Sequence, residues 1–242
     1  MKERWQKISA LALAAALTLL GGVQVFADGE QAPLTVGQSG PQPVLLAAAS
    51  AETGTDGLQY SYNNENLTAT VSRYTGTATE LVIPAEVTHE GKTYKVTAIG
   101  VAAFQGNSTL TRVTIPEGVT TIEYSAFSGC TSLTSITIPE DVTTISKYAF
   151  SGCTSLTNVT IPEGVTYIGN RAFLGCTSLK SVSLPASLTV CNRAFYGLNL
   201  TKVTFAHQEP PEFICRPLEG QAHAFLDATI EQIQLPEGAD EQ

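Results

Sequence analysis

The chain has 242 residues, with 13 Lys or Arg against 22 Asp or Glu, so its formal net charge is −9. Only 14% of the residues are charged, against a usual share of about 25%, while 43% are hydrophobic. This composition excludes a disordered chain, which combines low hydrophobicity with high charge. The acidic balance argues against nucleic acids and anionic membrane surfaces as partners, because both call for basic patches.

The first 27 residues have the features of a secretory signal peptide. Three basic residues stand among the first seven, residues 8–20 form an apolar run, and Val25 and Ala27 place small residues at the −3 and −1 positions of a cleavage site. The apolar run is too short for a spanning helix, which needs about 20 residues. We therefore expect a protein that is cleaved near Ala27 and is secreted or located at the cell surface, with no stable membrane insertion afterwards.

A repeat with a period of 23 residues runs through the middle of the chain. Phe104, Phe127, Phe150 and Phe173 follow this period, and Phe195 comes one residue early. Each Phe follows an Ala and stands two residues before a Gly, and most units continue with Leu-x-x-Ile-x-Ile-Pro or a close variant. A fixed period of this length is typical of a solenoid, whose units bury apolar side chains against their neighbours.

Within each unit, two short patterns predict the local structure. The alternating residues before Pro indicate a half-buried β-strand, which ends at Pro because Pro has no N–H to donate. The Ala-Phe-x-Gly step is too short for a full helix, and we interpret it as one helical turn ended by Gly in the left-handed conformation. The Phe should point inward and stack on the Phe of the next coil, which gives a parallel, β-rich solenoid.

The run AFSGCTSLTSITIPE from Ala126 to Glu140 recurs with little change. In this motif, and over roughly Tyr60 to Gly238, the chain resembles the BspA-like leucine-rich-repeat family. The resemblance implies a right-handed parallel leucine-rich-repeat solenoid, and export to the surface of bacterial cells or of some protozoa. For some members it implies adhesion to host proteins or other cells. It implies neither catalytic residues nor a cofactor.

We predict five segments along the chain. Two apolar stretches on either side of Asn63–Asn66, and a second pair that turns at Gly91, indicate antiparallel hairpins that cover the first coil. The segments are a signal peptide (1–27), a flexible leader (28–57), an N-terminal hairpin cap with the first strand (58–99), leucine-rich repeats (100–205), and a C-terminal insertion with a capping repeat (206–242).

The exposed side of the strands is the predicted binding surface, because solenoids often bind proteins on such extended faces. A β-branched Thr also suits a strand for structural reasons alone, so the pattern has a second explanation. The predicted face consists of Arg112, Thr114, Ser135, Thr137, Asn158, Thr160, Ser181, Ser183, Lys202 and Thr204. The alternative surface is an edge that carries Tyr124, Tyr148, Tyr167 and Tyr196.

Two columns of reactive side chains have simpler structural explanations. Cys130, Cys153 and Cys176 share one repeat position, where a disulfide between coils is geometrically conceivable, but a small buried side chain explains the column better. The second column is acidic and consists of Glu117, Glu140 and Glu163. A weak calcium site is conceivable there, although we expect a solvated acidic edge and no metal.

The leading hypothesis is an exported, non-enzymatic protein that binds another protein or a cell-surface ligand, with a possible role in adhesion. One alternative is a structural spacer module in a larger surface assembly. The least supported alternative is a secreted hydrolase or redox protein that uses Cys215 with His207 and His223, because no supporting motif surrounds these residues.

Cleavage of the signal peptide can be tested directly. We expect N-terminal sequencing of the protein from the medium or the cell surface to begin at Asp28. Recovery of intact protein from the cytosol, still starting at Met1, would contradict export.

Overall fold

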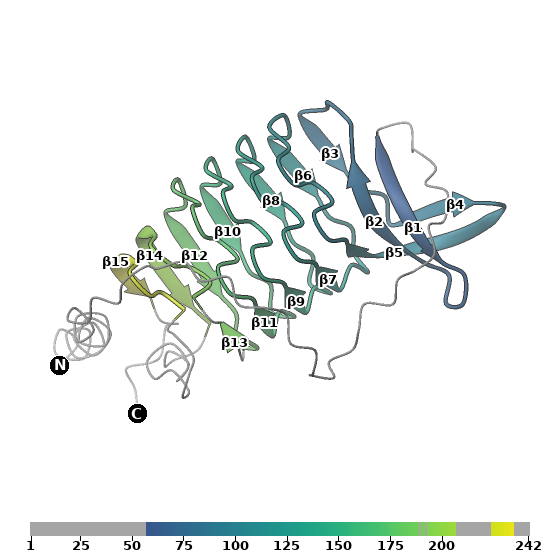
Figure 1. Ribbon diagram of the computed structural model, residues 1–242. Helices are drawn as coiled ribbons and strands as arrows, with labels where there is room; N and C mark the ends of the chain where they lie inside the picture. The colour runs from purple at the N-terminus through teal and green to yellow at the C-terminus, as the bar shows by residue number, and fades with distance from the viewer. Residues whose placement is uncertain (1–56, 189, 192, 207–223, 235–242) are drawn as a thin grey trace, which may run out of the picture.

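The computed structural model describes residues 57–188, 190–191, 193–206 and 224–234. The predicted signal peptide and leader, and most of the C-terminal insertion, lie outside these residues. The described part consists of strands and turns without an α-helix. Its coils stack along one axis, with a row of strands on each of two sides (Figure 1). The β-rich solenoid predicted from the repeat is therefore confirmed.

We call the first row of strands the strand face. All its hydrogen-bonded neighbours are parallel. Its strands are β3 (Glu80–Val82), β6 (Arg112–Thr114), β8 (Ser135–Thr137), β10 (Asn158–Thr160), β12 (Ser181–Leu184), β14 (Asn199–Phe205) and β15 (Thr229–Gln234). The second row, also parallel, consists of β5 (Lys92–Ile99), β7 (Thr121–Ile122), β9 (Thr144–Ile145), β11 (Tyr167–Ile168) and β13 (Val190–Cys191).

The N-terminal end of the stack carries three further strands, namely β1 (Leu58–Asn63), β2 (Thr68–Tyr74) and β4 (Glu86–His89). Strand β1 pairs antiparallel with β2, β4 pairs antiparallel with β5, and β2 joins β5 in parallel. The ring of Tyr74 lies 5.4 Å from that of Phe104. This arrangement places an aromatic side chain against the first coil, whose apolar end would otherwise meet water.

A column of phenylalanines runs through the core. Phe104, Phe127, Phe150, Phe173 and Phe195 are fully buried, and Phe225 continues the column. Neighbouring rings lie 4.7–5.3 Å apart between centroids and within 5–14° of parallel. The predicted stacking of each Phe on the next is confirmed, so each coil completes the apolar core of its neighbours.

The segments around each Phe form a third side of the solenoid, which we call the turn edge. It comprises residues 100–107, 123–130, 146–153, 169–176, 193–198 and 224–228. The backbone here forms consecutive hydrogen-bonded turns, for example from Ser128 N to Ser125 O (3.0 Å) and from Cys130 N to Phe127 O (3.1 Å). The predicted single helical turn is therefore wrong, whereas the left-handed glycine is confirmed by φ values of 67–75° at this position.

The sequence pattern did not reveal a second left-handed position, two residues before each Phe. Its φ values lie between 46° and 60° at Ala102, Ser125, Tyr148, Arg171 and Arg193. This conformation costs a non-glycine residue roughly 1–2 kcal/mol. It also directs the amide toward the next coil, as in the hydrogen bond from Tyr148 N to Asn170 O (3.2 Å). The bond between coils offsets part of the local cost.

Backbone hydrogen bonds along the turn edge tie the coils together where no strand exists. The amide of Phe127 donates to the carbonyl of Ala149 (2.8 Å), and the amide of Phe150 donates to that of Ala172 (2.8 Å). The cysteine column adds a side-chain contact, because Cys153 Sγ donates to Phe127 O (3.2 Å). Cys130, Cys153 and Cys176 are buried free thiols, so the structural explanation of this column is confirmed.

Threonine hydroxyls bind neighbouring coils together at the surface. Thr134 Oγ1 donates to Thr111 O (2.9 Å), and Thr143 Oγ1 donates to Thr120 O (3.3 Å), in each case 23 residues earlier. The short Thr side chain places its hydroxyl within hydrogen-bond distance of the carbonyl of the adjacent coil. Because the hydroxyl is uncharged, Thr residues that recur in successive coils do not repel one another. This repeated contact accounts for part of the low charged fraction of the chain.

Removal of one ring from the phenylalanine column tests its role. We expect Phe150→Ala to lower the free energy of unfolding by about 3–5 kcal/mol, because it leaves a cavity between two neighbouring rings. The adjacent Ser151→Ala should change it by less than about 0.5 kcal/mol. Urea denaturation compares the two variants, and a loss below about 1 kcal/mol for Phe150→Ala would show that the column is not the core.

Candidate functional site

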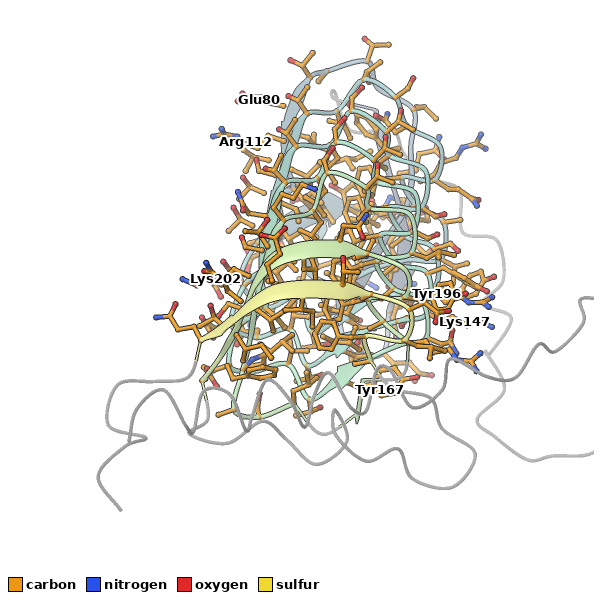
Figure 2. The ribbon with its side chains drawn as sticks, turned by 90° about the vertical axis from the view of Figure 1, so that its left-hand side faces the viewer. Glu80, Arg112, Lys147, Tyr167, Tyr196 and Lys202 are labelled. Carbon is orange, nitrogen blue, oxygen red and sulfur yellow. The ribbon has the colours of Figure 1, made fainter. Side chains whose placement is uncertain are left out.

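The ten predicted binding residues all lie on strands of the strand face, from β6 to β14. Their side chains flank the buried central residue of each strand, such as Val113 and Ile136. The register aligns Arg112 with Ser135 and Thr114 with Thr137. In the second half, it aligns Asn158 with Ser181, which then aligns with Lys202. Figure 2 shows Glu80, Arg112 and Lys202 on one side of the molecule.

Hydroxyl groups on this face differ from those that bind coils together. Among the described residues, the side chains of Thr114, Thr137 and Thr160 make no hydrogen bond to the protein, and the last two are exposed. By contrast, Ser181 Oγ donates to Asn158 Oδ1 (2.7 Å) within the face. Three successive coils therefore present hydroxyls whose donors and acceptors can serve a ligand.

The strand face is divided into two sheets, a feature absent from the sequence pattern. Strands β3, β6 and β8 form one sheet, and β10, β12, β14 and β15 form another. Where the two sheets adjoin, Thr157 N donates to Thr134 O (3.3 Å), just before β10 and β8 begin. The face thus consists of two panels, which meet between Thr137 and Thr160.

The chemistry of the face changes along the stack. Val82, at the N-terminal end, is 70% exposed. Charged residues stand at Glu80 and Arg112 near that end and at Lys202 near the other, while hydroxyl and amide groups occupy the strands between them. A ligand would meet a largely uncharged polar surface in the middle of the face.

The four tyrosines proposed as an alternative surface do not form one edge. Tyr124, Tyr148 and Tyr196 lie on the turn edge, where the first two rings meet edge to face with centroids 5.9 Å apart. Tyr167 lies on β11 in the second row of strands, and Figure 2 shows it apart from Tyr196. Tyr167 differs from the other three because it directly precedes the buried Ile168 within β11. The other three tyrosines lie in the turns that follow the strands of the second row.

The acidic column is exposed, as the sequence predicts, and two of its carboxylates also bond to the adjacent coil. Glu140 Oε2 accepts a hydrogen bond from Glu163 N (3.1 Å), and Glu163 Oε2 accepts one from Ala186 N (2.9 Å). Asp141 Oδ2 likewise accepts from Gly118 N (2.7 Å). These carboxylates satisfy backbone amides of adjacent coils at positions where the strands have ended.

One further carboxylate has an altered proton affinity. Glu123 is half-buried on the turn edge, and its Oε2 accepts a hydrogen bond from Val101 N (3.0 Å). Burial raises the pKa of Glu123 above its ordinary value, and the bond from the Val101 amide lowers it in part. The folded protein therefore binds this proton more tightly than the unfolded chain.

The groups considered for catalysis or metal binding are dispersed or lie outside the described residues. Of these residues, Cys215, His207 and His223 lie outside the described ranges. His89, within the predicted N-terminal hairpin cap, is buried and stacked on Tyr62, with ring centroids 4.2 Å apart. Within the described ranges, no group of three His, Cys, Asp or Glu side chains is arranged to hold a metal.

Comparisons with known proteins identify the repeat. The model of the BspA type leucine rich repeat region matches residues 97–209 in six copies. Among solved structures, the leucine-rich-repeat protein TpLRR of T. pallidum is similar at 26% identity and a TM-score of 0.56, over 76% of this chain and 85% of that one. No curated protein matches the sequence significantly.

Two further solved proteins have a similar structure. A leucine rich cell surface protein of Faecalibacterium prausnitzii is 32% identical with a TM-score of 0.50, over 76% of this chain and 55% of that one. The pneumococcal vaccine antigen PcpA is 19% identical with a TM-score of 0.58, over 79% of this chain and 51% of that one, and shares the fold. The chain therefore spans about half of each of these solved proteins.

The raised pKa of Glu123 predicts a pH-dependent stability difference. Its contribution to stability is present below the ordinary glutamate pKa and is lost as the pH rises through the higher folded-state pKa. In Glu123→Gln, the amide oxygen can still accept the bond from Val101. We expect this variant to melt about 1–2 °C above the wild type at pH 7, with the gap closing below about pH 4.

The control for this measurement is Glu117→Gln, because Glu117 is exposed and makes no hydrogen bond to the protein within the described residues. Its melting temperature should follow that of the wild type at every pH. A gap between Glu123→Gln and the wild type that stays constant from pH 3 to pH 7 would rule out the titration of Glu123 as its cause.

Proposed function

Because the chain belongs to the BspA-type leucine-rich-repeat family, we propose that it is an exported, non-enzymatic protein that binds another protein or a cell-surface ligand through its strand face. The signal peptide predicted at residues 1–27, with cleavage expected near Ala27, supports export. The similarity to a solved cell surface protein of F. prausnitzii supports a location at the cell surface. The part of the chain that the structure describes contains no helix with the length and apolar character needed to span a membrane.

The observation that carries this proposal is the contrast between two sets of threonines. Thr134 and Thr143 donate their hydroxyls to the preceding coil and thereby stabilise the solenoid. Thr137 and Thr160 are exposed and use their hydroxyls in no such bond within the described residues. The binding role therefore rests on side chains that the fold does not need for contact between coils.

The shape and chemistry of the strand face support a macromolecular ligand. Parallel strands about 4.8 Å apart repeat their side chains at a constant spacing along the stack, and such an extended surface suits a protein better than a small molecule. Between Arg112 and Lys202, the uncharged hydroxyl and amide groups can both donate and accept hydrogen bonds. Adhesion to host proteins or neighbouring cells is the form of binding that we propose.

A double charge insertion tests the strand face. The variant Thr137→Glu with Thr160→Glu places two carboxylates on this face. A bound ligand would remove water from both carboxylates, which costs binding free energy. We expect the amount of partner retained by the immobilised full chain to fall at least about tenfold. Binding is measured against surface proteins extracted from neighbouring bacteria and against host extracellular matrix, with the captured protein identified and then purified for titration.

The matched control is Thr131→Glu with Thr177→Glu, which adds the same charge at exposed residues outside the strand face. This control should bind as the wild type does, and both double variants should keep the melting temperature of the wild type within about 2 °C. Undiminished binding by the Thr137 and Thr160 variant would remove the strand face from the proposed function.

A further inference from the structure

We propose that the turn edge carries a second interaction surface, independent of the strand face, that binds an acidic segment of a protein partner. Its core consists of Lys147, Tyr148, Arg171, Arg193 and Tyr196, which we call the cationic edge. Figure 2 shows Lys147 and Tyr196 on the side of the molecule opposite Arg112 and Lys202. The two surfaces can therefore be altered separately.

The cationic edge repeats its positive charge along the stack. Tyr148, Arg171 and Arg193 occupy the same left-handed position in three successive coils, and Lys147 precedes Tyr148. The phenylalanine rings of these coils lie 5.3 and 5.1 Å apart. Alternate side chains of an extended peptide share one face about 6.6–7 Å apart. The long, flexible side chains of Glu, Lys and Arg can adjust to this difference, so several carboxylates of an extended acidic peptide can reach the cations of successive coils.

Contacts with tyrosine hold two of the cations in place. Arg171 Nη1 donates to the hydroxyl oxygen of Tyr148 (3.3 Å), and the Arg171 guanidinium lies 5.7 Å from the centroid of the Tyr196 ring. Lys147 Nζ lies 5.0 Å from the centroid of the Tyr148 ring. Side chains positioned before binding lose less conformational entropy when a ligand arrives. The donation from Arg171 also lowers the pKa of the Tyr148 hydroxyl.

The positive charge of this surface is not neutralised within the described residues. Lys147, Arg171 and Arg193 form no ion pair there, and the buried Nε atoms of both arginines have no hydrogen-bond partner. The carboxylate of Glu123, one coil away, accepts from the amide of Val101. An uncompensated group of cations on a chain with a net charge of −9 selects an anionic ligand.

The tyrosine contacts favour an acidic polypeptide over an acidic sugar. A sugar ring stacks on an open aromatic face, but Lys147 covers the ring of Tyr148 and Arg171 covers that of Tyr196. In the two coils that precede Lys147, Val101 and Tyr124 are 59% and 48% exposed and can contact an apolar side chain of the partner. Tyrosine and arginine are also the side chains that most often dominate protein–protein binding.

A labelled deca-glutamate peptide is the probe for this surface. We expect it to bind the full chain in fluorescence anisotropy at 100 mM NaCl, to bind more weakly at 500 mM NaCl because the contacts are ionic, and deca-lysine not to bind. Lys147→Gln with Arg171→Gln should weaken deca-glutamate binding at least about fivefold. Tyr148→Phe is a milder second variant, which removes only the hydrogen bond between Arg171 and the Tyr148 hydroxyl. It should weaken deca-glutamate binding about twofold.

The control is Arg112→Gln with Lys202→Gln, which removes the same charge from the strand face and should change the affinity less than about twofold. Equal weakening by both double variants would show attraction by net charge and overturn the proposal. Failure of deca-glutamate to bind, including the case in which a heparin octasaccharide binds in its place, would also overturn it. Circular dichroism melts establish that each variant is folded.

This surface is separable from the proposed function of the strand face. Thr137→Glu with Thr160→Glu should lose the strand-face partner and still bind deca-glutamate. If that variant also lost the peptide while remaining folded, the two surfaces would be one and the independence proposed here would be wrong.

Discussion

Stacking of each coil on the next is the interaction on which the rest of the structure depends. A single coil cannot bury its own Phe, because the flat faces of a ring such as Phe150 are covered by Phe127 and Phe173 from the neighbouring coils. The same contact brings backbone groups of successive coils into hydrogen-bond range on three sides. Hydrophobic burial and backbone pairing therefore reinforce each other, and stability is a sum over the interfaces between coils.

Stacking also divides the surface by role. Side chains that reach the adjacent coil become structural, as with Thr134, Glu140 and Glu163, which bond to its backbone. Side chains that point away from this contact remain available to ligands, and they gather on the strand face and on the turn edge. The two sides differ in chemistry because one is built from β-strands that favour Thr, and the other from turns that hold Tyr, Lys and Arg.

Features that repeat within one coil could be predicted well. The period, the inward Phe and the left-handed Gly follow from local chemistry, and Cys153 was recognised as a small buried residue. Predictions were incomplete or wrong where the partner of a side chain lies in another coil. The sequence predicted an exposed Glu140 but not the hydrogen bond that it accepts from the amide of Glu163. It also placed the four tyrosines on one edge, although Tyr167 lies on β11.

The amino-acid sequence by itself determined that this chain forms a leucine-rich-repeat solenoid, because a 23-residue period with a fixed apolar pattern can bury its core only by stacking. It also determined which residues line the strand face. Only the tertiary structure decided that the face has two panels and that Arg171 is held between Tyr148 and Tyr196. These features depend on distances of a few ångströms between coils, and such distances are set when the coils pack and not by the order of residues within one coil.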